Sequence, residues 1–263
     1  MKAAVLRALG RLGLLLPAYR GYERLRAFGA QRIAVGPDGL PVPPPELIVR
    51  VAGTADADWF LEGGRLAEES IRAALARAGT SVEAAGAILD FGCGCGRVVR
   101  RWQSLAGPVH GTDLNADAIA WCREHLPFAR FEVNALEPPL PLTDGSLGLV
   151  YALSVLTHLA VETQLRWLDE LRRVLRPGGW LLVTVHGEAY LPRLNAAEAA
   201  RFDGGECVVR WSEVAGSNLC TTFHPESFVR ETLAQGWELV ELVPRGALGN
   251  PEQDLVLLRK PAV

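Results

Sequence analysis

A glycine-rich loop is the part of the sequence best suited to hold a small ligand. Gly92, Gly94 and Gly96 follow a short apolar run and precede a stretch with helical character. Glycines at such a place permit positive φ and let a ligand approach the main chain closely, and the first turn of a helix offers unpaired N–H groups. The G-x-G-x-x-G spacing of dinucleotide sites needs a third glycine where this chain has Arg97 or Val99. The loop therefore predicts a nucleotide-like ligand that is not a dinucleotide.

Two carboxylates narrow the chemistry of that ligand. Asp90 stands just before the loop, where it would repel a pyrophosphate and attract a cation. Asp113 ends the next apolar run, and a carboxylate at that place can accept both ribose hydroxyls in doubly wound nucleoside sites. The alternative for Asp113 is a helix N-terminal acid beside Asn115. The two acids favour a ligand with a nucleoside at one end and a positive charge at the other.

Histidines at two later positions could accept a proton from a substrate. His158 follows the fourth expected strand and His186 ends the fifth, and the carboxyl ends of parallel strands carry the sites of this architecture. His186 is the favoured base, whereas a helix-capping or core role explains His158 equally well. Tyr190 and His224 flank a long insertion, where each could line a substrate pocket or simply pack. The catalytic candidates are His186, His158 and Tyr190.

The elements that would position these residues follow from an alternation of apolar runs with helical patterns. Strands are expected over residues 87–91, 109–113, 129–135, 147–153, 180–185, 237–243 and 254–259. Helices are expected over residues 56–78, 97–105, 116–126, 162–176 and 226–235. Strands that alternate with helices of these lengths predict a doubly wound, mostly parallel α/β sheet with helices on both faces.

The chain is expected to divide into an extension, a lead-in and a core. Residues 1–45 should form a basic helical extension and a proline-rich linker, because the first 32 residues carry seven basic residues and one acid. Such a helix could cap the domain, contact another subunit in a homo-oligomer or lie on a membrane surface. Capping or an oligomer contact is the favoured interpretation. Residues 46–86 are expected to form a helical lead-in or lid, and residues 87–263 the core.

An insertion follows the fifth expected strand. It covers residues 187–224, whereas connections of this kind usually hold about 2–6 residues. Residues 207–211 could form a strand within it. Because long insertions beside a central strand are more often functional than idle, this one is expected to shape an acceptor pocket.

Composition bounds the class of protein. The chain of 263 residues is 49% hydrophobic and has a formal net charge of −3, which is ordinary for a globular domain and gives no overall attraction to nucleic acid. Its five cysteines fit neither a disulfide scaffold nor paired metal-binding knuckles. No apolar run reaches the roughly 18 residues of a membrane span. These observations predict a cytoplasmic protein without a metal site or a transmembrane segment.

The order of the motifs resembles that of class I S-adenosylmethionine-dependent methyltransferases. Residues 88–96 resemble the family's first motif, Asp-x-Gly-x-Gly-x-Gly, and residues 143–150, 153–159 and 171–179 resemble later family segments. The resemblance implies a Rossmann-like, seven-stranded sheet in the order 3-2-1-4-5-7-6, whose seventh strand is antiparallel. It also implies S-adenosylmethionine as the cofactor.

The resemblance further implies which residues meet that cofactor. Asp113 matches the family's ribose-binding acid, and Asn134 stands where many members carry an acid that faces the adenine. Trp59 and Phe60 precede the first strand, where aromatic residues could form a lid. The implied cofactor contacts are Phe60, Asp90, Gly92, Cys93, Gly94, Gly96, Asp113, Leu114, Asn134, Ala135, Leu153 and Ser154.

Methylation of an oxygen in a small-molecule or carbohydrate-type acceptor is the favoured function, on the strength of the insertion. N- or C-methylation of a specialised metabolite and a non-catalytic S-adenosylmethionine-binding partner subunit are the alternatives. The loop spacing and Asp90 disfavour a nicotinamide oxidoreductase. A nucleic-acid acceptor is not expected, because residues 153–156 do not resemble the Asn/Asp-Pro-Pro-Tyr/Phe motif of base methylation.

Overall fold

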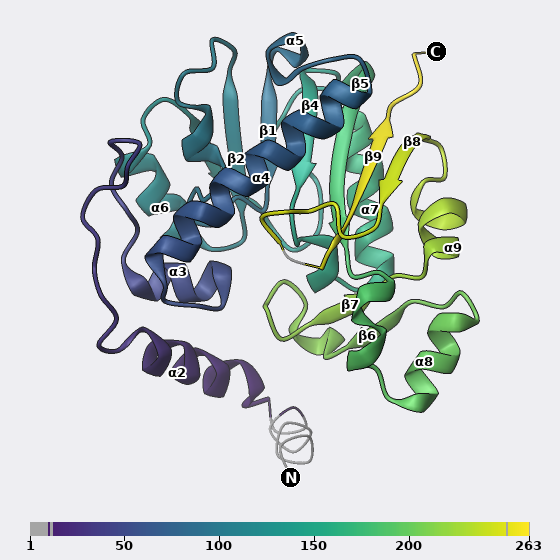
Figure 1. Ribbon diagram of the computed structural model, residues 1–263, viewed down its shortest axis with the longest axis horizontal. Coiled ribbons are helices and arrows are strands. Elements are labelled where there is room, and N and C mark those ends of the chain that lie inside the picture. The colour runs from purple at the N-terminus through teal and green to yellow at the C-terminus, as the bar shows by residue number, and fades with distance from the viewer. Residues whose placement is uncertain (1–9, 11–12, 251, 263) are drawn as a thin grey trace.

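A seven-stranded sheet forms the centre of the molecule (Figure 1). The computed structural model of the chain describes residues 10, 13–250 and 252–262. The sheet consists of β1 (Ile88–Phe91), β2 (Val109–Asp113), β3 (Arg130–Val133), β4 (Leu147–Ala152), β5 (Leu175–Val185), β8 (Glu238–Val243) and β9 (Asp254–Arg259). Their order is β3-β2-β1-β4-β5-β9-β8, and β9 runs antiparallel to both of its neighbours. The expected order and the antiparallel seventh strand are confirmed, with β8 and β9 as the sixth and seventh strands of the core.

The central strands are apolar because both of their faces are covered. Every residue of β1 and β4 is buried, which is the usual state of a parallel strand between two helical layers. The register sets Asp90 of β1 beside Gly111 of β2 and Tyr151 of β4. The carboxyl ends of these strands therefore lie together at one edge of the sheet.

Helices cover the two faces of the sheet. The α-helices are α2 (Leu15–Ala27), α3 (Pro45–Ala52), α4 (Ala57–Arg77), α5 (Val82–Ala85), α6 (Ala116–His125), α7 (Val161–Val174), α8 (Ala196–Asp203) and α9 (Glu226–Phe228). Shorter turns are the 3-10 helices η1 (Val99–Trp102), η2 (Leu156–His158), η3 (Glu188–Arg193) and η4 (Ser212–Val214), and the π-helix η5 (Val229–Leu233). Residues of α4, η1 and α6 share one core cluster, and residues of α7 and η5 share another. In Figure 1, α4 crosses in front of the sheet and α7 lies behind it.

Three elements differ from the sequence prediction. The helix expected over residues 97–105 is only the short η1, because the buried side chains of Arg97 and Arg100 turn inward to bind Asn250 and Asp38, which an apolar pattern does not reveal. The helix expected over residues 226–235 is split into the short α9 and the π-helical η5. The fifth strand begins at Leu175 instead of residue 180, because Leu175 pairs with Leu147 ahead of a register shift.

The proline-rich linker is fixed to the core through one buried ion pair. Asp38 accepts hydrogen bonds from Arg100 Nε at 2.6 Å and Nη2 at 2.7 Å, and the side chains are only 7% and 1% exposed. Arg100 also donates to the carbonyls of Leu40 and Pro41. A buried charge is tolerated when its partners satisfy it in this way. The linker therefore holds α3 near the carboxyl edge of the sheet.

The insertion forms a small unit with its own core. It contains η3, α8, η4 and a two-stranded antiparallel ribbon of β6 (Val208–Arg210) and β7 (Thr221–Phe223), so the strand expected over residues 207–211 is present. Tyr190, Phe202, Val208 and Phe223 pack together inside it. This unit and the helices α2 and α3 lie at the same end of the molecule, beyond the carboxyl ends of the parallel strands (Figure 1). No helix in the described part of the chain has the length and apolarity to span a bilayer.

Candidate cofactor and active site

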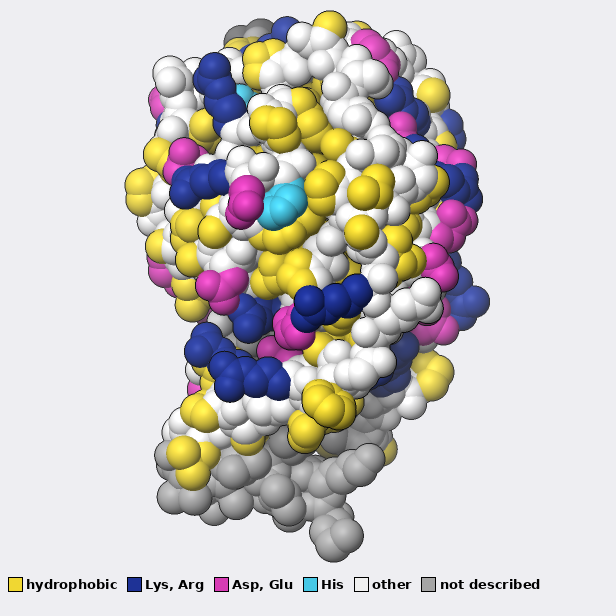
Figure 2. Space-filling model, turned by 90° about the vertical axis from the view of Figure 1, so that its left-hand side faces the viewer, with side chains coloured by type: hydrophobic (Ala, Val, Ile, Leu, Met, Phe, Trp, Pro, Cys, Tyr) yellow, Lys and Arg dark blue, Asp and Glu magenta, His cyan; other side chains and the backbone are white. Residues whose placement is uncertain are grey.

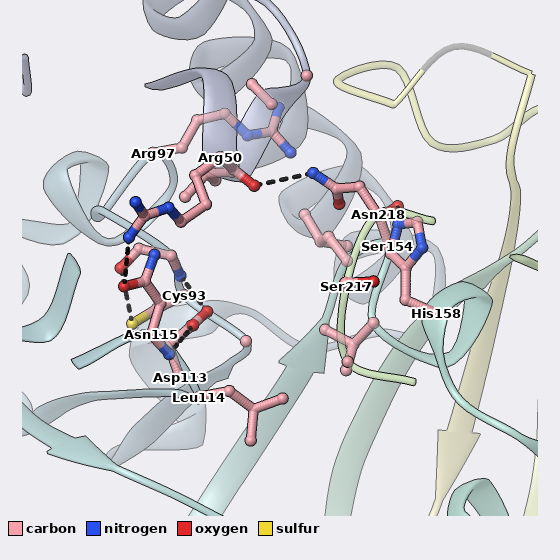
Figure 3. Close-up of a pocket in the computed structure, with 18 of the residues that line it drawn as sticks. Arg50, Cys93, Arg97, Asp113, Leu114, Asn115, Ser154, His158, Ser217 and Asn218 are labelled. Atoms are coloured by element: carbon pink, nitrogen blue, oxygen red, sulfur yellow. Dashed lines mark hydrogen bonds between the residues drawn. The ribbon is translucent and has the colours of Figure 1, made fainter. Parts of the chain in front are cut away.

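A cavity of about 980 Å³ opens at the carboxyl ends of β1, β2 and β4. Its walls come from the glycine loop, the ends of these strands, α2, the end of α3 and residues 216–218 of the insertion. Figure 3 shows Asp113 and Arg50 on one side of the cavity, with Ser154, His158 and Asn218 across from them. Small-molecule sites commonly have volumes of about 300–1,000 Å³, so the space is large enough for two ligands.

The glycine loop is held in a tight turn. Gly92 and Cys93 donate their N–H groups to the carbonyl of Thr112 at 2.8 and 2.9 Å. Gly92 has a φ of 79°, and a Cβ there would come within 2.3 Å of Val155 Cγ2. A side chain at position 92 would therefore be strained in both its backbone and its packing. The loop brings main-chain atoms to the cavity wall without intervening side chains.

Asp113 is oriented by the main chain at the end of β2. One carboxylate oxygen accepts the N–H of Gly94 at 2.8 Å, and the other accepts the N–H of Asn115 at 2.7 Å. Burial raises the pKa of this carboxyl, and the two backbone hydrogen bonds oppose the rise. Each oxygen has a second lone pair, so the carboxylate can also accept two hydroxyl groups from a ligand in the cavity.

Asp90 and Arg97 place opposite charges at one end of the cavity. Burial raises the pKa of Asp90 to about 7, although a hydrogen bond from Tyr151 and the charge of Arg97 oppose it. Tyr151 is held in turn by Trp102 Nε1, which donates to its hydroxyl at 2.8 Å. Arg97 donates to the carbonyl of Gly249 at 2.9 Å and is 8% exposed. An acid beside a guanidinium suits a ligand that carries both an ammonium and a carboxylate.

The other end of the cavity combines apolar walls with unsatisfied polar atoms. Leu114 and Leu136 line it, and each is 37% exposed. Among the described residues, Asn134 Oδ1 and Asn115 Nδ2 are buried atoms without a hydrogen-bond partner. Buried polar atoms are ordinarily paired, so these two are available to the edge of a bound heterocycle or sugar. This end suits a nucleoside.

His158 presents one ring nitrogen toward the cavity. Its Nδ1 donates to the carbonyl of Cys220 at 2.7 Å, which leaves Nε2 as the acceptor, 3.5 Å from Ser154 Oγ. Burial lowers the pKa of His158, so the ring is neutral at pH 7 and can take up a proton. The insertion, through Cys220, therefore fixes the tautomer of the histidine.

His186 lies behind His158 and Ser154 and does not line the cavity. It is 6% exposed, its Nδ1 bonds the carbonyl of Thr222 at 3.1 Å, and its Nε2 lies 3.3 Å from Gln253 Nε2. Gln253 also donates to Ser154 Oγ at 2.9 Å, so it stands between His186 and the cavity. The ring of Tyr190 packs on His186 with centroids 4.1 Å apart. Geometry thus favours His158 over His186 and Tyr190 as the group that meets a substrate.

Most of the cofactor contacts expected from the sequence share the cavity wall. Those that line it are Asp90, Gly92, Cys93, Gly94, Asp113, Leu114, Asn134, Ala135, Leu153 and Ser154. Phe60 is fully buried in a cluster with Leu47 and Ile48, and its neighbour Trp59 lines the cavity instead. Gly96 faces Leu126 and lies outside the wall.

Several wall residues were missed by the sequence reasoning. Arg97 directly follows the glycine loop, and this position could have indicated that it lines the cavity. Arg50 of α3 and Asn218 of the insertion were not foreseeable, because the contact from Asn218 Nδ2 to the Arg50 carbonyl at 2.8 Å joins segments far apart in the chain. Tyr19 of α2 also lines the cavity and hydrogen-bonds Asn218. Within the described residues, no cluster of three or more metal-ligating side chains is present.

Known proteins share this fold. Residues 89–183 match the family described as a methyltransferase domain. A 1,6-didemethyltoxoflavin-N1-methyltransferase of Burkholderia thailandensis, solved with S-adenosylhomocysteine, superposes with a TM-score of 0.53 at 16% identity over 76% of this chain and 79% of that one. The sheet order is that of the Rossmann-like methyltransferase fold. Residues 89–183 thus form a methyltransferase domain, and the comparisons support a class I S-adenosylmethionine-dependent methyltransferase, for which S-adenosylmethionine is the cofactor.

Curated relatives differ in what their names say they methylate. A malonyl-[acyl-carrier protein] O-methyltransferase of Pectobacterium atrosepticum is 29% identical over 54% of this chain and 50% of its own length. A tRNA N(3)-methylcytidine methyltransferase of Drosophila melanogaster is 30% identical over 56% of this chain and 47% of its own length. The chain thus spans about half of each relative. The expectation that excludes nucleic acid finds no support in these relatives.

Proposed function

We propose that this chain transfers the methyl group of S-adenosylmethionine to a hydroxyl oxygen of a small-molecule or carbohydrate-type acceptor. When bound, the cofactor supplies an electrophilic methyl group on a sulfonium. The single observation that carries the oxygen assignment is His158, which lines the cavity and keeps Nε2 as a proton acceptor because Nδ1 donates to the carbonyl of Cys220. An alcohol must lose a proton as it is methylated, and a positioned base supplies that function.

The charges and unsatisfied atoms of the cavity support the cofactor's placement. Asp113 would accept the ribose hydroxyls, and Asn134 would bind the adenine edge with its unpaired oxygen. Asp90 would face the ammonium and Arg97 the carboxylate of the methionine end. Each pairing joins a group already oriented by the protein to a ligand group of opposite polarity, which limits the ordering cost of binding.

The acceptor would lie on the His158 side of the cavity. Ser154 and His158 come from the segment after β4, and Ser217 and Asn218 of the insertion line the same region. Ser154 is itself fixed, because its N–H donates to Thr184 Oγ1 at 2.7 Å. Holding an acceptor oxygen in line with the methyl group is where enzymes of this chemistry gain much of their rate.

An acceptor screen tests the proposed function. The purified full chain would be incubated with methyl-labelled S-adenosylmethionine and four acceptor groups: sugars, hydroxylated aromatic metabolites, an acyl-carrier thioester and tRNA. Label is expected on oxygen in one of the first two groups. Transfer only to tRNA, or to nitrogen or carbon, would refute the oxygen assignment. Cofactor binding without transfer to any acceptor would favour the non-catalytic subunit.

A further inference from the structure

Helix α2 has a buried inner face that fixes it over the cavity. Leu15, Glu23 and Ala27 are between 3% and 8% exposed. Glu23 lies 4.0 Å from Arg50 Nε, and Tyr19 hydrogen-bonds Asn218 of the insertion. These contacts come from α3 and from the insertion, so the helix is oriented from two directions. One side of α2 therefore faces the protein and the opposite side faces away from it.

The outward side of α2 is unusually apolar for a free surface. It carries Leu25, which is 76% exposed, and the cap residues Leu14 and Phe28 at the two ends of the helix are 49% and 88% exposed. Leu25 and Phe28 are the most exposed large apolar side chains in the described part of the chain. Pro17, Ala18 and Gly21 fall on the same side at helical spacing. We call this surface the outer face of α2.

Arginines flank the outer face of α2. The single acidic residue of this helix, Glu23, lies on the inner face. Arg20, Arg24 and Arg26 are exposed at the rim of the cavity, which they also line, while Glu23 is buried on the inner face. None of the three arginines forms an ion pair with a described carboxylate. Figure 2 shows basic and apolar side chains next to each other just above the grey atoms, at the end of the molecule that carries α2. The patch is locally positive in a chain whose formal net charge is −3.

We propose that the outer face of α2 docks this protein on the surface of an anionic phospholipid bilayer. Helices that lie in a membrane interface combine a polar, basic side with Leu and aromatic residues that enter the acyl boundary. Leu25 and Phe28 are the residues placed to enter it, and Arg20 and Arg24 are placed to meet the phosphate groups. Each basic residue near an anionic leaflet strengthens binding by about fivefold.

The charges argue against a second copy of the chain as the occupant. A twofold interface would bring the outer face of α2 against itself. The arginines of both copies would then meet without an acid on either helix to pair with them, because Glu23 is buried on the inner face. An anionic lipid surface neutralises the same residues. The sequence favours capping or an oligomer contact over membrane contact for this region, and lipid docking concerns the outer face of α2 alone.

Docking through this face would set the cavity on the other side of α2 from the lipid headgroups, about one helix diameter away (about 10 Å). The residues of α2 that line the cavity are Leu16, Tyr19, Arg20, Tyr22, Glu23, Arg24 and Arg26. The helix thus forms both a wall of the cavity and the proposed contact with the bilayer. Attachment to the bilayer through this face requires no particular acceptor.

Vesicle sedimentation with the full chain tests the docking. The wild type is expected to sediment with phosphatidylcholine vesicles that contain phosphatidylglycerol, and far less with phosphatidylcholine alone. Leu25→Glu with Phe28→Glu should abolish sedimentation. Arg20→Gln with Arg24→Gln should weaken it by about twenty-five-fold, from two basic residues at about fivefold each. The matched control is Val240→Glu, which alters an apolar residue 36% exposed on β8 and should bind as the wild type does.

Three outcomes would overturn the docking proposal. The first is a wild type that does not sediment with anionic vesicles. The second is sedimentation that the Leu25 and Phe28 substitutions leave unchanged while the unfolding transition shows an intact fold. The third is a dimer in analytical ultracentrifugation that these substitutions dissociate, together with no vesicle binding, which would assign the face to a second copy.

Discussion

The affinity for S-adenosylmethionine should fall as the pH is lowered through 7, and Asp90 should be the cause. Burial raises the pKa of this carboxyl to about 7 in the free protein. Only the ionised form attracts the ammonium of the cofactor, so binding below that pKa must release one proton. The ionised fraction is about nine-tenths at about pH 8 and about one-tenth at about pH 6, and the wild-type Kd should therefore rise about tenfold between them.

Isothermal titration calorimetry at both pH values measures this effect. The matched variant is Asp90→Asn, which keeps the shape of the side chain and removes the titration. Asp90→Asn should bind S-adenosylmethionine more weakly than the wild type does at the higher pH. Its Kd should lack the rise of about tenfold that the titration of Asp90 causes in the wild type. The amino group of the cofactor titrates equally in both experiments, so it cancels in the difference. Equal pH slopes in the two proteins would refute the role of Asp90.

Other predictions concern the base and the linker. His158→Gln should lower kcat by about 10²-fold or more with little change in cofactor Kd. His186→Gln should lower kcat less, because Gln253 separates His186 from the cavity. Equal losses of kcat in the two variants would contradict the assignment of His158 as the base. The rate of the wild type should fall only below the lowered pKa of His158, as protonation removes the base, which a pH–rate profile under saturating cofactor measures. Asp38→Ala should reduce the free energy of unfolding by about 3–5 kcal/mol, because Arg100 would keep a buried charge without its partner; urea denaturation with an unchanged midpoint would contradict this.

The strands and long helices could be predicted because their patterns of apolar residues follow directly from which of their faces are buried. β1 and β4 are apolar throughout since both faces are covered, and α7 alternates at helical spacing since one face meets the sheet. The short η1 could not be predicted, because the tertiary partners of Arg97 and Arg100 decide its form. Local pattern is a weak guide wherever distant residues provide the hydrogen bonds.

The site residues at the carboxyl ends of the parallel strands could be predicted from the sequence. Those that reach the cavity from α2 and from the insertion could not. Asp90, the glycine loop and Asp113 follow consecutive strands, and parallel topology brings those ends together. Trp59 and Phe60 are neighbours in α4, where each residue turns by about 100°, so the sequence alone could not tell which one faces the cavity. Asn218 and Tyr19 reach the cavity from the insertion and from α2, and their meeting depends on packing between segments without a shared periodicity.

The most direct test of the cofactor site is calorimetric titration of the wild type and Asp113→Ala with S-adenosylmethionine and S-adenosylhomocysteine. The wild type should bind both in the micromolar range, about −8 kcal/mol. Asp113→Ala should bind at least about hundredfold more weakly, because hydrogen bonds to a charged group contribute about 1.5–3 kcal/mol each. Asp169→Ala, an exposed acid on α7, should bind as the wild type does. Absence of binding by the folded wild type, or unchanged affinity in Asp113→Ala, would contradict the cofactor site derived from this fold.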